Sequence, residues 1–93
     1  MSKPWFVYML RCADDSLYTG ITTDLERRVA EHNGEVKTAG AKFTRSRQPV
    51  CLIHQEIHDS RSAATRREME IKSLSRQQKL DLIEQALGKK VFH

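Results

Sequence analysis

Two short apolar runs, each carrying a tyrosine, constrain the fold of this chain more than any other feature. Residues 5–11 and 16–21 are typical of β-strands, because the first is almost entirely apolar and both are too short for a helix without caps. The polar break between them contains Asp14, Asp15 and Ser16, which favour a tight turn. The two runs therefore predict a β-hairpin.

The register of this hairpin follows from the length of its loop. A three-residue loop pairs Cys12 with Ser16 and places Tyr8 opposite Gly20. Since side chains alternate along a strand with a period of two, Tyr8 and Tyr18 then point to the same face of the sheet. Gly20 is typical of a place that a ligand or another backbone approaches closely. The two phenols form either the floor of a site or, as the more ordinary alternative, a pair of half-buried packing residues.

The charge balance indicates the kind of partner. Sixteen Lys and Arg residues against twelve Asp and Glu give a net charge of +4 and a pI of about 9.3, which favours nucleic acid or another polyanion, although a generic basic domain has the same balance. A chain of 93 residues predicts a single domain, 1–93, with a modest core spanning about 5–87. Without a secretory segment or a long apolar run, we expect a cytoplasmic protein that does not enter a membrane and keeps Cys12 and Cys51 as reduced thiols.

A predicted helix over residues 24–33 aims polar groups inward. Asp24 is a suitable N-cap and Gly34 ends the helix. The positions i, i+3, i+4 and i+7 form one stripe that should face the protein. This stripe consists of Leu25, Arg28, Val29 and His32. It therefore places a guanidinium and an imidazole beside two hydrophobic anchors.

After a predicted loop at 35–41, residues 42–47 interleave cations with an aromatic ring. The segment reads Lys42, Phe43, Thr44, Arg45, Ser46 and Arg47. Such a mixture suits phosphate contacts with a ring for stacking. The alternative is an ordinary solvated basic turn with Phe43 tucked into the core.

The second half of the chain predicts a strand over residues 50–57 and two further helices. The first helix is capped by Asp59 or Ser60. The second begins at a capping box at 75–78 and is ended by Gly88. The histidines at 54 and 58 are interpreted as packing or surface residues and not as a zinc pair.

Glu68 falls on the core-facing stripe of the first of these helices. The stripe also holds Ala64, Arg67 and Ile71, whereas Glu70 lies off it, within reach of Arg66. A carboxylate on such a stripe is costly unless it has a partner, a metal or a chemical role. The ordinary alternative is a salt bridge from Glu68 to Arg28 or Arg67.

Taken together, the order strand–strand–helix–strand–helix, with Tyr18 ten residues before Arg28, resembles the GIY-YIG nuclease superfamily. The likeness is greatest to its small stand-alone bacterial members. The first family motif stands here as Phe6-Val7-Tyr8 and the second as Tyr18-Thr19-Gly20. The resemblance implies catalytic roles for Tyr8, Tyr18, Arg28, His32 and Glu68, with Glu68 as the metal ligand.

The implied activity is Mg²⁺-dependent (or Mn²⁺-dependent) hydrolysis of DNA phosphodiester bonds, in DNA repair or a damage response. One glutamate plus waters suits such an ion, and Arg28 can contact a phosphate bidentately. A nearby guanidinium would lower the pKa of Tyr8 so that it could deprotonate a water. Which of Tyr8, Tyr18 and His32 takes the proton is left open.

The expected nucleic-acid contacts are Gly20, Lys42, Arg45 and Arg47. DNA is the expected partner, RNA is a second candidate, and a repair protein is a third, for a monomer or weak dimer. Two alternative functions remain: a nucleic-acid-binding module of the same fold with little or no cleavage activity, and a structural domain of a larger repair assembly. The predicted fold class is α/β (α+β), with a three-stranded antiparallel sheet flanked by three or more helices.

Overall fold

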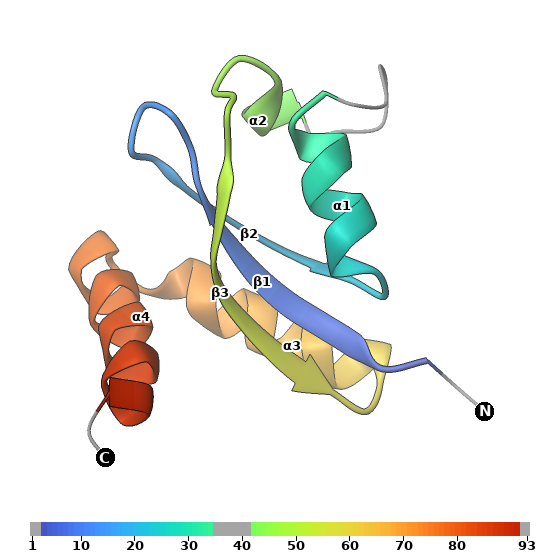
Figure 1. The fold of residues 1–93 in the computed structure, drawn as a ribbon. Helices are drawn as coiled ribbons and strands as arrows, with labels where there is room; N and C mark the ends of the chain where they lie inside the picture. The colour runs from blue at the N-terminus through green and yellow to red at the C-terminus, as the bar shows by residue number, and fades with distance from the viewer. Residues whose placement is uncertain (1–2, 35–41, 92–93) are drawn as a thin grey trace.

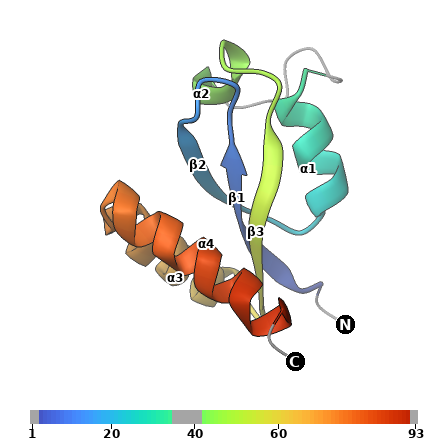
Figure 2. The ribbon, with the colours of Figure 1, turned by 60° about the vertical axis from the view of Figure 1, so that its left-hand side comes forward.

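A three-stranded antiparallel β-sheet separates two pairs of helices (Figure 1). The computed structural model describes residues 3–34 and 42–91. In chain order its elements are β1 (Trp5–Arg11), β2 (Leu17–Thr22), α1 (Leu25–His32), α2 (Lys42–Arg45), β3 (Cys51–His58), α3 (Arg61–Ser73) and α4 (Arg76–Val91). The strand order is β2-β1-β3, with α1 and α2 on one face of the sheet and α3 and α4 on the other (Figure 2). This α+β architecture confirms the predicted fold class.

The hairpin has the predicted register. Tyr8 lies opposite Gly20 and Leu10 lies opposite Tyr18, so the two tyrosines share one face. The backbone N–H of Cys12 donates to the carbonyl of Ser16 at 2.9 Å and closes the loop. Loop length therefore fixed which face the phenols occupy.

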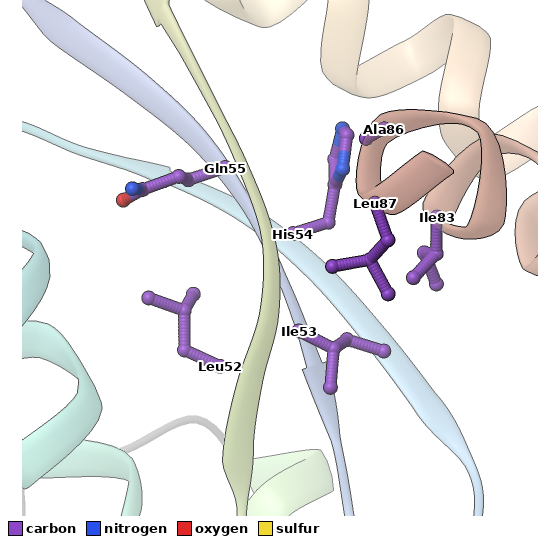
Figure 3. Close-up of a pocket in the computed structure, with 7 residues that line it drawn as sticks. All are labelled: Leu52, Ile53, His54, Gln55, Ile83, Ala86 and Leu87. Atoms are coloured by element: carbon purple, nitrogen blue, oxygen red, sulfur yellow. The ribbon is translucent and has the colours of Figure 1, made fainter. Parts of the chain in front are cut away.

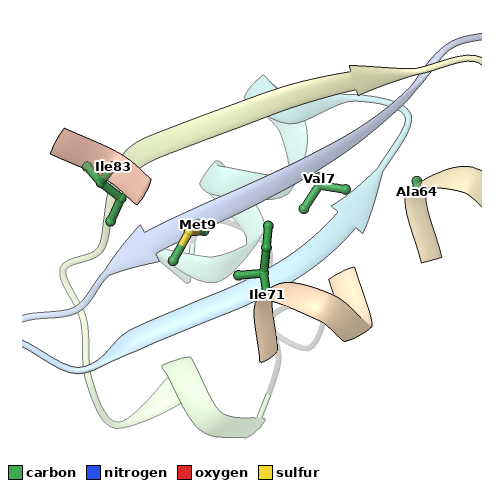
Figure 4. Packing of buried hydrophobic residues seen from close by; sticks show 5 residues of the cluster. All are labelled: Val7, Met9, Ala64, Ile71 and Ile83. Carbon is green, nitrogen blue, oxygen red and sulfur yellow. The ribbon is translucent and has the colours of Figure 1, made fainter. Parts of the chain in front are cut away.

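Alternation along β1 divides the core into two clusters. Val7 and Met9 pack with Ala64, Ile71 and Ile83 on the face covered by α3 and α4 (Figure 4). The intervening residues, Tyr8 and Leu10, pack with Cys12 and Val50 on the α1 face. Because β1 is the central strand, its apolar residues are buried on both faces.

A register shift in β3, opposite Met9 and Leu10, interrupts the alternation of that strand. Ile53 and His54 consequently both point towards α4, whereas Leu52 and Gln55 point to the other side (Figure 3). The residues of β3 and α4 enclose a hollow of about 260 Å³ there. None of the predicted catalytic residues lines it.

The helix starts follow the predicted capping chemistry. The side chains of Asp24 and Ser60 accept from backbone N–H groups three residues on, each at 3.1 Å. Ser75 and Gln78 exchange hydrogen bonds in a capping box.

Two predictions about helix boundaries were wrong. Gly88 does not end α4, which continues to Val91; a glycine inside a helix costs only about 1 kcal/mol and does not break it. The short helix α2 was not predicted, because four residues are too few to show a period.

The predicted loop at 35–41 lies outside the described residues. Within the described ranges, no helix has the length and apolar composition to cross a bilayer.

Candidate active site

The phenol of Tyr8 lies at the centre of the candidate site and is buried against Gly20. A Cβ atom at position 20 would stand only 2.6 Å from the Tyr8 hydroxyl. Gly20 is itself buried, and its lack of a side chain leaves room for the phenol. A contact between Gly20 and nucleic acid stays a prediction.

A chain of buried hydrogen bonds runs from Tyr8 through His32 to Thr44. The Tyr8 hydroxyl lies 2.9 Å from Nε2 of His32, and Nδ1 of His32 lies 2.8 Å from Oγ1 of Thr44. The three side chains come from β1, α1 and α2 and are nearly inaccessible to solvent. Thr44 belongs to the segment that was expected to contact phosphate, but it faces His32 inside the protein.

Arg28 also contacts this chain. Its guanidinium is close enough to the Tyr8 hydroxyl to donate a hydrogen bond to it. The Tyr8 oxygen has a second lone pair, so the hydroxyl can either donate its proton to Nε2 of His32 or accept one from it. In the first arrangement neutral His32 carries its proton on Nδ1 and donates it to Thr44.

Burial keeps both titratable members of the chain neutral. Loss of solvent raises the pKa of Tyr8 to about 12, more than the nearby Arg28 lowers it. The same loss of solvent, together with the charge of Arg28, lowers the pKa of His32 to about 4. The expectation that a guanidinium would lower the pKa of Tyr8 overall was therefore wrong for this structure, because desolvation outweighs it.

Arg28 is also held by a carboxylate on the same helix. Glu31 accepts from Nη1 of Arg28 at 2.9 Å and from Nε of Arg27 at 3.2 Å. The hydrogen bond from Arg28 holds the pKa of Glu31 below its usual value. The sequence signal for this contact was the spacing of three and four residues along one helix.

Glu68 stands on α3, in the layer on the other side of the sheet. Its negative charge adds a small further rise to the pKa of Tyr8, and its side chain is only 18% exposed. Oε2 of Glu68 lies 3.4 Å from Nζ of Lys72, one helical turn on. Among the described residues this is the ion pair of Glu68, in place of the expected pairs with Arg28 or Arg67.

Arg67 instead joins α3 to β3. Its Nε and Nη2 atoms bind the carboxylate of Glu56 at 2.9 and 3.1 Å, and Nη1 lies 3.3 Å from Glu70. Glu70 thus pairs with Arg67 and not, as predicted, with Arg66. His54 and His58 both hydrogen-bond to Glu56, in keeping with the packing role expected of them.

Aromatic rings extend the candidate site towards the surface. The ring of Tyr18 lies 4.9 Å from that of His32 and 5.9 Å from that of Phe43. Phe43 is 38% exposed, so it is not tucked into the core. Arg47 stacks over it at 4.0 Å and pairs with Asp14 at 3.0 Å.

Arg45 and Lys42 are the two other expected nucleic-acid contacts. Arg45 is exposed and available to a phosphate. The side chain of Lys42 lies outside the described residues.

The carboxylate of Glu68 fits a hard ion that keeps most of its water. In the part of the chain that the structure describes, no three His, Cys, Asp or Glu side chains gather in a way that would hold a metal. The described residues therefore do not form a metal site in which every ligand is a protein side chain. Mg²⁺ or Mn²⁺ can bind a single partly exposed carboxylate and fill its remaining coordination positions with water, provided that Lys72 moves away from Glu68.

Comparisons with known proteins agree with this arrangement. A family model described as the GIY-YIG catalytic domain matches residues 4–81. A UPF0213 protein of Natronomonas pharaonis is 56% identical over 89 residues, covering 95% of this chain and all of that protein. One of Staphylococcus haemolyticus is 54% identical over 80 residues, covering 86% of this chain and 94% of that protein.

Two solution NMR structures share the fold. A UPF0213 protein from Bacillus halodurans is 42% identical, with a TM-score of 0.56, covering 87% of this chain and 83% of that one. A protein from E. faecalis is 40% identical, with a TM-score of 0.60, covering 92% and 90%. The chain therefore belongs to the GIY-YIG family, a nuclease-type family, and is similar to its UPF0213 members.

Proposed function

We propose that this protein is a nuclease that hydrolyses DNA phosphodiester bonds with Mg²⁺ or Mn²⁺ held at Glu68, acting in the cytoplasm in DNA repair or a damage response. One observation carries the proposal. The Tyr8 hydroxyl lies 2.9 Å from Nε2 of His32 and within hydrogen-bond reach of Arg28, and the partly buried carboxylate of Glu68 on α3 is close enough for its charge to affect the same phenol. Family membership supports the same reaction class.

Each residue has a distinct task in this proposal. Glu68 holds the ion, which when bound supplies positive charge and a Lewis acid at the phosphate. Arg28 donates to the phosphate oxygens as negative charge develops on them, which a fixed fork of N–H groups does better than an ammonium. Glu31 holds Arg28 in position through the 2.9 Å ion pair.

Tyr8 is the proposed proton acceptor for the attacking water. At rest its high pKa keeps it protonated, so it accepts a proton only if its own proton moves on. Nε2 of His32 lies 2.9 Å away, and in this proposal it is the unprotonated nitrogen of the ring. The chain thus offers a path from the Tyr8 hydroxyl to His32, with Thr44 fixing the far side of the ring. Tyr18 positions this imidazole by stacking at 4.9 Å.

A cleavage assay with matched variants tests the proposal. Purified protein is offered single-stranded, duplex and branched DNA with and without Mg²⁺ or Mn²⁺. We expect Arg28→Ala and Glu68→Ala each to lower cleavage at least about 100-fold. Arg27→Ala and Glu70→Ala are the controls, since each removes the same charge from a neighbouring exposed position, and they should retain most activity. Equal activity in Arg28→Ala, Glu68→Ala and the unmodified protein would refute the assignment.

A second candidate is a nucleic-acid-binding module with little cleavage activity. It is favoured by the way the candidate catalytic groups engage one another: Arg28 pairs with Glu31, Glu68 pairs with Lys72, and Tyr8 holds its proton. This candidate predicts salt-sensitive DNA binding with no metal-dependent cleavage in the same assay.

A further inference from the structure

A second hollow lies on α3, outside the candidate active site, with a mostly apolar lining and two arginines among the residues around it. Five residues line an open hollow of about 580 Å³ there: Arg61, Ser62, Thr65, Arg66 and Met69. They supply two guanidinium groups, two hydroxyls and a thioether side chain that is 65% exposed. None of them has a part in the chain of contacts around Tyr8.

Helical geometry places one side of this hollow in line with Glu68, which does not itself line the hollow. At 3.6 residues per turn, positions 61, 65, 68 and 72 form one row along α3, and positions 62, 66 and 69 form the adjacent row. Thr65 therefore lies about one turn, roughly 5 Å, from Glu68 on the same side of the helix. Arg61 lies about one turn further.

The cations of the hollow are not neutralised within the described structure. Arg67 is paired with Glu56 and Lys72 with Glu68, whereas no described carboxylate pairs with Arg61 or Arg66. The guanidinium of Arg61 stands over the ring of Trp5 at 5.6 Å, which holds it at one edge of the hollow. The hollow thus carries two guanidinium groups without a carboxylate partner among the described residues, beside a mostly apolar lining.

We propose that this hollow binds the sugar–phosphate backbone of the nucleic acid that flanks the bond held at Glu68. The proposal rests on the proposed function for the position of that bond. Arginine forks and small hydroxyls are typical donors to phosphate oxygens, and the exposed Met69 offers an apolar contact for a sugar or base. The nucleic acid then runs along α3, from Glu68 towards Arg61.

Binding measured without a divalent ion tests this path independently of cleavage. Affinities of the unmodified protein and of Arg61→Gln/Arg66→Gln for a labelled duplex and a labelled single strand are measured in EDTA over a range of salt. We expect the variant to bind on the order of tenfold more weakly, with the slope of log affinity against log salt reduced by about two, because two phosphate contacts are lost. The matched control is Arg76→Gln/Lys79→Gln, which removes the same charge from α4, and it should lose little.

Two outcomes would overturn the proposal: an unchanged affinity and slope in the hollow variant, or an equal loss in the α4 control. Because Arg61 also contacts Trp5, the double variant could lose affinity through a folding defect. The single variant Arg66→Gln leaves that contact intact and should reduce the salt slope by about one. Failure of the proposed function looks different, because it abolishes cleavage in the unmodified protein while leaving these binding curves intact. If the protein does cleave, the hollow variant should hydrolyse a small phosphodiester such as bis(p-nitrophenyl) phosphate at the unmodified rate, because that substrate is too short to reach the hollow.

Discussion

The hydroxyl of Tyr8 and Nε2 of His32 lie 2.9 Å apart, although twenty-four residues separate them in the chain. This contact joins the central strand of the sheet to the first helix. Because both groups are buried and neutral, the contact is part of the core as well as the start of the proposed proton path. Changes at either residue should therefore alter stability and activity together.

Tyr8→Phe removes the hydroxyl and retains the ring. Nε2 of His32 then loses its partner in a buried site, and we expect a loss of about 1–3 kcal/mol in the free energy of unfolding. Urea denaturation followed by circular dichroism measures this, and cleavage should fall at the same time. Tyr18→Phe is the control: it retains the stacking on His32 and should change stability by no more than about 0.5 kcal/mol. Equal losses of unfolding free energy in the two variants would mean that the hydrogen bond from Tyr8 to His32 does not account for the effect.

Gly20→Ala should destabilise the protein because its new methyl group would meet the Tyr8 phenol. The ideal Cβ lies 2.6 Å from the hydroxyl and 2.7 Å from Cζ, so the ring must shift. We expect a loss of about 1–3 kcal/mol, measured by urea denaturation.

A double-mutant cycle isolates this cause. In a Tyr8→Ala background the phenol is absent, and adding Gly20→Ala should cost almost nothing further. If Gly20→Ala costs the same in both backgrounds, its effect arises from the backbone and not from Tyr8.

His32 should make stability fall as the pH is lowered below about 6.5. The unfolded chain binds a proton near its ordinary pKa of 6.5, whereas the folded protein resists protonation until about pH 4. Stability is thus fully present above pH 6.5 and is lost between pH 6.5 and 4, by at most about 3 kcal/mol for a shift of this size.

Unfolding free energies from pH 8 to 4.5 check this dependence. His32→Gln should lower the stability at pH 8 but flatten the decline below pH 6.5. His58→Gln, which removes a half-buried histidine from β3, should leave the decline as it is in the unmodified protein. A decline of the same steepness in His32→Gln would assign the pH dependence to other groups.

Sequence reasoning predicted those features that depend on local period and spacing. The opposition of Tyr8 and Gly20 followed from loop length, and the inward stripe of α1 followed from the helical period. Both are properties of one element or one hairpin.

Sequence reasoning did not predict side-chain contacts that depend on how distant elements pack together. Thr44 was placed in a basic surface segment, but α2 folds back so that its hydroxyl meets His32. The alternative for Glu68 was a salt bridge to Arg28 or Arg67, but the cation that pairs with it is Lys72. The pKa of Tyr8 rises because several elements remove solvent from it, and no single stretch of sequence shows how much solvent remains.

Lys72 should compete with the divalent ion for Glu68. Its ammonium lies 3.4 Å from Oε2 of Glu68 on an exposed part of α3, where such ion pairs contribute about 0.2–1 kcal/mol. Lys72→Gln removes this competitor, so we expect the concentration of Mg²⁺ or Mn²⁺ at half-maximal cleavage to fall up to about fivefold, the factor that corresponds to 1 kcal/mol. Isothermal titration calorimetry with Mn²⁺ should show the same gain in affinity without any substrate. Lys79→Gln removes an equal charge from α4 and should change neither value. A metal requirement that stays the same or increases in Lys72→Gln would show that Lys72 does not occupy the position that the ion takes, and would direct attention away from Glu68 as its ligand.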